Sequence, residues 1–233
     1  MAPMQYRVLS FLLPEWMARS GMNIVHPYLL LRFAALALGF WFAALIMREL
    51  VDRPSAPAAM VVALGLFYVS TIRAHLQPSE EPNLLIFALF IWLVLRGADI
   101  GWLAMVMAVG VVNKDTVGFL IPFLFFYRWA TGRGVWVTLR DSAILSGIFL
   151  AGYLSVRMFY GTERHYLGGV WQAGYNFDFM VSRPVPGSFW LLPSLLPLAV
   201  LLARWNRVPL AARCFVPSLL LFVIGHWLIS RID

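Results

Sequence analysis

Residues 96–128 of this 233-residue chain read RGADIGWLAMVMAVGVVNKDTVGFLIPFLFFYR. Two apolar runs, Ile100–Val112 and Val117–Trp129, are separated by the polar turn Asn113–Thr116 and bounded by arginines. Neither run alternates apolar and polar residues with a period of two, as a membrane β-strand does. Because a backbone in lipid must satisfy its own hydrogen bonds, the stretch predicts two helices joined at a charged turn.

These two runs are short for a membrane. Runs of 12 to 14 residues cover roughly 18–21 Å at about 1.5 Å per residue, whereas the hydrocarbon core of a bilayer is about 30 Å thick. Charged ends that reach the interface, burial among neighbouring helices, or a re-entrant hairpin over 100–129 would each resolve the mismatch. The sequence leaves all three arrangements open.

The composition of the whole chain indicates that lipid is its solvent. It is 61% hydrophobic and 12% charged, whereas soluble domains carry about 25% charged residues. The formal net charge of +7 comes from arginine, since Lys114 is the only lysine. The arginines stand at the ends of apolar runs, which argues against a nucleic-acid partner and favours membrane lipid. The only cysteine, Cys214, permits neither an intrachain disulfide nor a Cys/His metal cluster, and we expect it to be buried.

Eight apolar segments predict an all-α fold, a polytopic integral membrane bundle of transmembrane or half-spanning helices. We expect a single helical membrane domain over 1–233. In it, 1–27 is an outer amphipathic segment, 28–160 holds six helices, 161–187 is an outer loop and 188–230 holds two helices. The expected helices are Tyr28–Met47, Pro57–Ile72, Pro82–Leu95, Ile100–Val112, Val117–Trp129, Ser142–Tyr160, Ser188–Ala203 and Ala211–Ser230.

Positive charge is distributed unevenly between alternate connections. The more basic set comprises the connections 48–56, 96–99, 128–141 and 204–213. It holds 9 Arg in 37 residues, whereas the alternate segments hold 8 Arg or Lys in 75 residues. The positive-inside rule places the basic set in the cytoplasm of a bacterial inner membrane. The polar loops 73–81, 113–116 and 161–187 are then extracytoplasmic. Because residues 1–27 would lie outside with no signal segment, we expect the chain to be a fragment that lacks an N-terminal span.

Two carboxylates stand together at the start of one expected helix. Glu80 and Glu81 precede Pro82, and a carboxylate in this position faces the positive end of the helix dipole. One interpretation is a capped and solvated helix start. The other is a functional carboxylate that binds a sugar hydroxyl, a metal ion or a cationic group. Both residues are candidate catalytic groups.

The turn Asn113–Thr116 carries the second group of chemical candidates. Charged residues at membrane depth are costly and are functional by default. Lys114 offers a point charge for a phosphate, and Asp115 or Thr116 can cap the helix that follows, leaving its N-terminus open to an anion. The alternative is a Lys114–Asp115 pair that only neutralises itself. Asp115 is the third catalytic candidate.

The outer loop 161–187 mixes aromatic, amide and charged side chains. This composition suits carbohydrate, with ring faces stacked on the sugar and polar groups on its hydroxyls. The alternative is an aromatic helix that lies at the membrane interface. His165 and Asp178 offer an acid–base pair, and Arg32 is expected to reach the outer interface. The substrate-binding candidates of this region are Arg157, Arg164, His165, Tyr175 and Asp178.

Three short motifs carry a resemblance to a known family. They are Gln5-Tyr6-Arg7-Val8-Leu9 with Pro14, the turn from Gln77 to Pro82, and Asn113–Thr116 followed by a helix that contains Pro122. Together they resemble segments of polytopic glycosyltransferases of the GT-C type. The resemblance implies sugar transfer from a polyprenyl-phosphate-sugar donor to a lipid, glycan or protein on the outer face, with a divalent metal as an optional cofactor.

The chain also departs from the pattern of that family. The family's catalytic carboxylate lies in the first outer loop, and no residue here matches it. Asp115 stands where the family often has Glu. We therefore expect this fragment to be inactive alone. Two other functions stay open: a membrane transporter or lipid flippase with a site at Lys114–Asp115, or a non-enzymatic membrane assembly subunit. The assembly subunit predicts that the polar clusters lie far apart.

Overall fold

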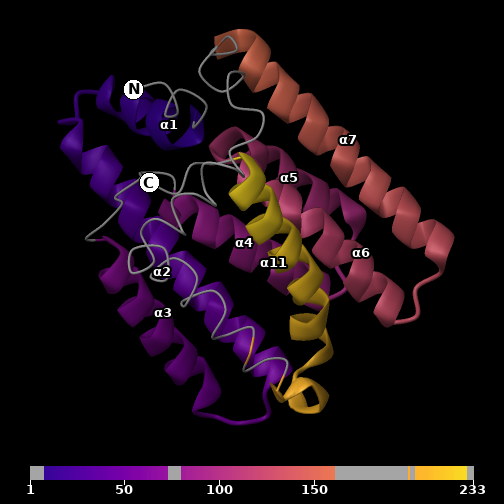
Figure 1. Cartoon of the computed structure of the whole chain (residues 1–233). Coiled ribbons are helices and arrows are strands. Elements are labelled where there is room, and N and C mark those ends of the chain that lie inside the picture. The colour runs from indigo at the N-terminus through magenta and orange to yellow at the C-terminus, as the bar shows by residue number, and fades with distance from the viewer. Residues whose placement is uncertain (1–7, 73–79, 161–198, 200–202, 230–233) are drawn as a thin grey trace, which may run out of the picture.

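A computed structural model describes residues 8–72, 80–160, 199 and 203–229, and all of their regular structure is helical (Figure 1). The expected all-α fold is thereby confirmed for this part of the chain. The helices are α1 (Val8–Ala18), α2 (Val25–Leu50), α3 (Ala56–Ile72), α4 (Glu80–Leu95), α5 (Ile100–Asn113), η2 (Asp115–Phe119), α6 (Leu120–Ala130), α7 (Val135–Tyr160), η3 (Trp205–Arg207) and α11 (Leu210–Ile229).

The short helices α5 and α6 form the centre of the bundle. Leu103 and Met107 of α5 and Leu120 and Leu124 of α6 are fully buried. Figure 1 shows α2 and α3 on one side of this hairpin and α7 on the other, with α4 and α11 packed close to it. Burial among neighbours is thus one arrangement that the structure uses to accommodate these two short helices.

Two helices among the described residues are long and apolar enough to cross a membrane. They are α2, with 26 residues, and the segment Val135–Phe159 of α7, with 25 residues. Only 6% of the most apolar window of α7 is buried inside the protein, which is unlike the core helix of a soluble domain. On length and composition alone, these two helices indicate association with a membrane. α4 and α5 have 16 and 14 residues and fall short of a full span.

The start of α7 corrects one expected boundary. The expected helix began at Ser142, because Arg140 and Asp141 seemed to end the apolar run, whereas α7 begins at Val135. Asp141 points into the protein and accepts hydrogen bonds from Arg128 of α6 and from Arg140. The pairing allows a carboxylate that is 3% exposed to lie within the helix. The segment 135–141 is therefore helical and is no loop.

One end of the bundle holds four connections between helices, and we call it the arginine end (Figure 1). They are 51–55, 96–99, 131–134 and 203–209. Gly97 and Gly132 adopt positive φ there, at +68° and +79°, and end α4 and α6. Arg128 also donates to the carbonyl oxygen of Ala98 at 3.3 Å, so one buried side chain connects three turns or helices. Arg96 and Glu49 form an exposed ion pair at 3.0 Å at the same end.

Candidate functional site: a recessed polar centre

The end of the bundle opposite the arginine end brings together Lys114 and Glu80. The Nζ atom of Lys114, in the turn after α5, donates to Oε1 of Glu80, the first residue of α4, at 2.5 Å. The lysine side chain is 18% exposed and the glutamate side chain 41% exposed. The pair therefore lies between the interior and the surface of the bundle, and its carboxylate is accessible from outside.

A second ion pair lies directly beside the first. Arg32 of α2 donates from Nε to Oε1 of Glu81 at 2.7 Å, and its Nη2 atom contacts the same oxygen. The Glu81 side chain is 2% exposed and the Arg32 side chain 27% exposed. We call Arg32, Glu80, Glu81 and Lys114 the polar centre. Its two cations balance its two carboxylates.

Neutral hydrogen-bonding groups surround the polar centre. Ser10 of α1 donates to Oδ1 of Asn113 at 2.7 Å, and both residues are fully buried. Thr116 and Asn83 meet more loosely, at 3.5 Å between Oγ1 and Oδ1. These contacts join α1, α4, α5 and η2 around the ion pairs, so five elements, with α2, converge on this end.

Helix lengths place the polar centre below the end of the bundle. Arg32 lies about seven residues into α2, roughly 10 Å from its start at about 1.5 Å per residue. Val111, about one turn before Lys114, lies against Gly152 of α7. Because α7 continues to Tyr160, it extends roughly 8 Å past the level of Lys114 at about 1.5 Å per residue. Figure 1 shows α7 extending past the end of α5, with α1 near the same end. The charged groups are thus recessed between longer helices.

Three glycines permit the close helix approaches that assemble this site. A Cβ atom on Gly39 would lie 3.1 Å from Leu84, at the contact of α2 with α4. On Gly110 it would lie 2.9 Å from Val117, which fixes the turn that carries Lys114. On Gly152 it would lie 2.3 Å from Val111, at the contact of α7 with α5. The absence of a side chain at these positions sets the spacing of the helices and hence of the charges.

The structure brings together three of the residues that the sequence singles out and leaves others apart. Glu80, Glu81 and Lys114 share the polar centre. Asp115 is exposed, and no ion pair joins it to another described residue, so the self-neutralising Lys114–Asp115 pair is not the one that forms. No side-chain cap is made at the start of η2.

The remaining candidates lie elsewhere. The guanidinium group of Arg157 stacks on the ring of Tyr153 one turn earlier, 4.2 Å from its centroid. The candidates of the outer loop, Arg164, His165, Tyr175 and Asp178, fall outside the described residues, and their roles stay predictions. Cys214 is buried in the core, as expected.

Sequence reasoning missed the partner of Glu81. Arg32 was expected only to reach the interface, yet it is the cation that holds the buried carboxylate. A signal existed for the other pair: α4 and α5 are joined by a turn centred on residues 97–98, so residues equidistant from it lie level. Glu80 and Glu81 precede that centre by the same number of residues by which Lys114 and Asp115 follow it, so the two pairs of residues are expected at the same level of the bundle.

The polar centre offers cations and carboxylates but no cluster typical of a metal site. The part of the chain that the structure describes contains no group of three His, Cys, Asp or Glu side chains placed to hold a metal ion. An anionic ligand that contacts Lys114 must share it with, or take it from, Glu80. The arrangement can therefore exchange one oxyanion for another at a fixed lysine.

Comparisons with known proteins give no relative. No family model, curated protein or solved structure matches this chain.

Proposed function

We propose that the chain belongs to a multi-pass membrane protein that transfers a sugar from a polyprenyl-phosphate donor to a lipid, glycan or protein acceptor on the extracytoplasmic face. The single observation that carries the proposal is the contact between Lys114 and Glu80 beside the Arg32–Glu81 pair. It assembles a phosphate-binding cation and two carboxylates from segments far apart in the sequence. An assembly subunit without chemistry would need no such convergence.

The surface of the arginine end supports placement in a membrane. Trp102, Trp129 and Trp136 lie near its turns and are 59%, 56% and 84% exposed. Exposed indole rings next to arginines are typical of a membrane–water interface on the cytoplasmic side. The polar centre, at the other end of the bundle, then faces the extracytoplasmic side and is reached from the outer leaflet.

The charges of the polar centre suit a phosphate that arrives from lipid. A lysine in a recess of low dielectric attracts a phosphate more strongly than one in water does. Lys114 is the candidate for this contact, since its ammonium group is a compact point charge on a flexible stem. Arg32 is engaged by Glu81, so its role is to hold the second carboxylate in place.

Glu80 supplies a candidate base in this scheme. When the donor phosphate takes Lys114, the Glu80 carboxylate is released from its ion pair and can accept a proton. The acceptor hydroxyl oxygen then bonds to the anomeric carbon of the sugar, the bond from that carbon to the phosphate oxygen breaks, and the hydroxyl proton passes to Glu80. The polyprenyl phosphate leaves with the negative charge next to Lys114.

The test separates binding from transfer. The full-length protein to which this chain belongs is purified and placed in liposomes. It is incubated with a polyprenyl monophosphate to measure binding, and with polyprenyl-phosphate-linked radiolabelled sugars to measure transfer. Lys114→Ala should lower both, whereas Glu80→Gln should retain binding and lower transfer by about 10²- to 10⁴-fold, as for a lost general base. Arg53→Ala, at the arginine end, is the control for charge loss. Unchanged transfer in Lys114→Ala would overturn the proposal.

A transporter or lipid flippase is the second candidate. The observation in its favour is that two short helices, of 14 and 11 residues, turn at Lys114 inside a bundle with longer neighbours. Interrupted helices with charged turns form the substrate sites of many transporters. Movement of a labelled lipid phosphate across the liposome membrane, with no change in its covalent structure, would favour this function over sugar transfer.

A further inference from the structure

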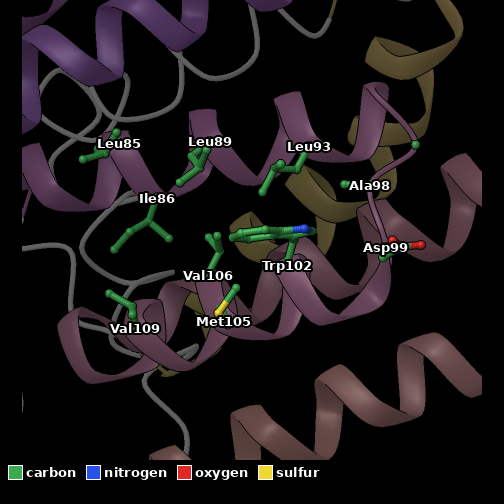
Figure 2. A pocket seen from close by; sticks show the side chains of 11 residues that line it. Leu85, Ile86, Leu89, Leu93, Ala98, Asp99, Trp102, Met105, Val106 and Val109 are labelled. Carbon is green, nitrogen blue, oxygen red and sulfur yellow. The ribbon is translucent and has the colours of Figure 1, made fainter.

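An apolar groove of about 690 Å³ runs between α4 and α5 (Figure 2). Leu85, Leu89 and Leu93 line it from α4, and Trp102, Val106 and Val109 line it from α5. Its volume is within the range of about 300–1,000 Å³ that is usual for small-ligand sites. The walls are hydrocarbon along both helices, so the groove suits a hydrocarbon chain.

One end of the groove is polar. Asp99, at the turn between α4 and α5, lines the groove there and is exposed. No ion pair joins Asp99 to another residue that the structure describes. Figure 2 shows the ring of Trp102 lying along the groove, with its nitrogen toward Ala98 and Asp99. An indole ring in this position suits the boundary between hydrocarbon and headgroups.

A positive group lies close to the same turn. The Nη2 atom of Arg133 lies 3.6 Å from the position that a Cβ atom on Gly97 would take. Arg133 is exposed, and it too forms no ion pair within the described part of the chain. Arg96 of this turn is paired with Glu49. The mouth of the groove therefore has one carboxylate and one guanidinium group without an ion pair among the described residues, which is the complement of a zwitterion.

We propose that the groove holds an acyl chain of a zwitterionic phospholipid with a primary ammonium headgroup, phosphatidylethanolamine, from the leaflet at the arginine end. Its ammonium group donates hydrogen bonds to Asp99, and its phosphate lies against Arg133. A quaternary choline ammonium has no N–H to donate. A glycerol headgroup brings no positive charge to the carboxylate. The inference rests on the membrane placement within the proposed function and is independent of sugar transfer at Lys114.

Native mass spectrometry of the purified protein titrated with lipids tests the headgroup. Phosphatidylethanolamine, phosphatidylcholine and phosphatidylglycerol with identical acyl chains are compared. The unmodified protein should bind phosphatidylethanolamine most tightly. Asp99→Asn should weaken that binding about two- to five-fold, the range of an exposed charge pair, and abolish the preference. Asp52→Asn, an exposed aspartate at the same end, is the matched control and should change nothing. Equal binding of the three lipids, or a preference for phosphatidylglycerol, would overturn the headgroup assignment.

A second variant tests the groove itself. Val106→Trp fills the groove and should weaken all three lipids together. Val62→Trp, on an exposed face of α3 where Val62 is 61% exposed, adds the same ring elsewhere and should have no effect. Unaltered lipid binding in a folded Val106→Trp protein refutes the groove as the site. Loss of phosphatidylethanolamine in Lys114→Ala but not in Asp99→Asn would move the headgroup to the opposite end and equally refute it. Failed sugar transfer with intact lipid preference would count against the proposed function alone.

Discussion

Removing the cation from the Arg32–Glu81 pair should destabilise the protein more than removing the carboxylate. The reason is the difference in burial, because the Glu81 side chain is 2% exposed and the Arg32 side chain is 27% exposed. Arg32→Gln takes the guanidinium group away from a carboxylate that cannot turn to solvent. Glu81→Gln leaves a long arginine that can extend toward the exposed end of the bundle.

The two costs can be bounded from that geometry. Breaking a buried ion pair so that one charge stays buried costs about 3–5 kcal/mol, which is the expectation for Arg32→Gln. Glu81→Gln should cost about 1.5–3 kcal/mol, in the range of a lost hydrogen bond to a charged group. The double variant should cost less than the sum, because the second change removes the buried charge from which the first one took the arginine.

The single cysteine provides the assay. Cys214 is 7% exposed, so a thiol-reactive fluorophore should label it only when the bundle unfolds. For a domain of this size, about 1 kcal/mol corresponds to about 2–4 °C in Tm, so Arg32→Gln should lower Tm by about 6–20 °C. Glu81→Gln should lower it by about 3–12 °C under the same conversion.

The control is another Arg–Glu pair on the same chain. Arg96 and Glu49 have side chains that are 56% and 36% exposed, so Arg96→Gln should cost less than about 1 kcal/mol. Equal shifts of Tm for Arg32→Gln and Arg96→Gln would refute the reasoning, because burial would then decide nothing. A larger loss for Glu81→Gln than for Arg32→Gln would show that the arginine is the stranded group.

Three further predictions concern packing, the arginine end and orientation. Gly152→Ala should destabilise the protein by about 1–3 kcal/mol, because the added methyl group overpacks the contact with Val111. Gly147→Ala on the same helix should stabilise the protein by up to about 1 kcal/mol, because its Cβ would meet nothing within 4 Å. Thermal unfolding of the two variants measures the sign of each change. Asp141→Ala should cost about 3–5 kcal/mol, because it leaves a buried guanidinium group without its carboxylate, and a loss below about 1 kcal/mol would contradict this. In a background without the native cysteine, Met22→Cys should react with a membrane-impermeant maleimide on intact cells and Ser55→Cys only after permeabilisation; the reverse result would invert the proposed topology.

Much of the helical pattern was readable from hydrophobicity alone. The apolar runs expected at Pro57–Ile72 and Ile100–Val112 correspond to α3 and α5 almost residue for residue. The boundary at Ser142 was wrong because the sequence cannot show that Asp141 is neutralised by a distant arginine. An unpaired charge ends an apolar segment, and a paired one does not.

The two ion pairs of the polar centre differ in how well the sequence alone could predict them. Lys114 and Glu80 lie on consecutive antiparallel helices with a short turn, so their levels follow from counting outward from that turn. Arg32 and Glu81 lie on α2 and α4, which run parallel, with α3 between them in the sequence. No local sequence pattern predicts that α2 packs on α4. The contact is possible because Gly39 has no side chain, and this effect becomes visible only when the helices are assembled.

The recess of the polar centre is connected with the shortness of α4 and α5. These helices are about 24 Å and 21 Å long, and Glu80 and Lys114 lie at the same end of the bundle. Their longer neighbour α2 continues past that level and contributes Arg32 from within its apolar length. The charges therefore meet where each can be compensated, below the surface and beside one another. A substitution that extends the apolar run of α5, such as Lys114→Leu, should remove the reason for the recess together with the Glu80 ion pair and the proposed phosphate contact, whereas Lys114→Gln removes the ion pair and the proposed contact alone.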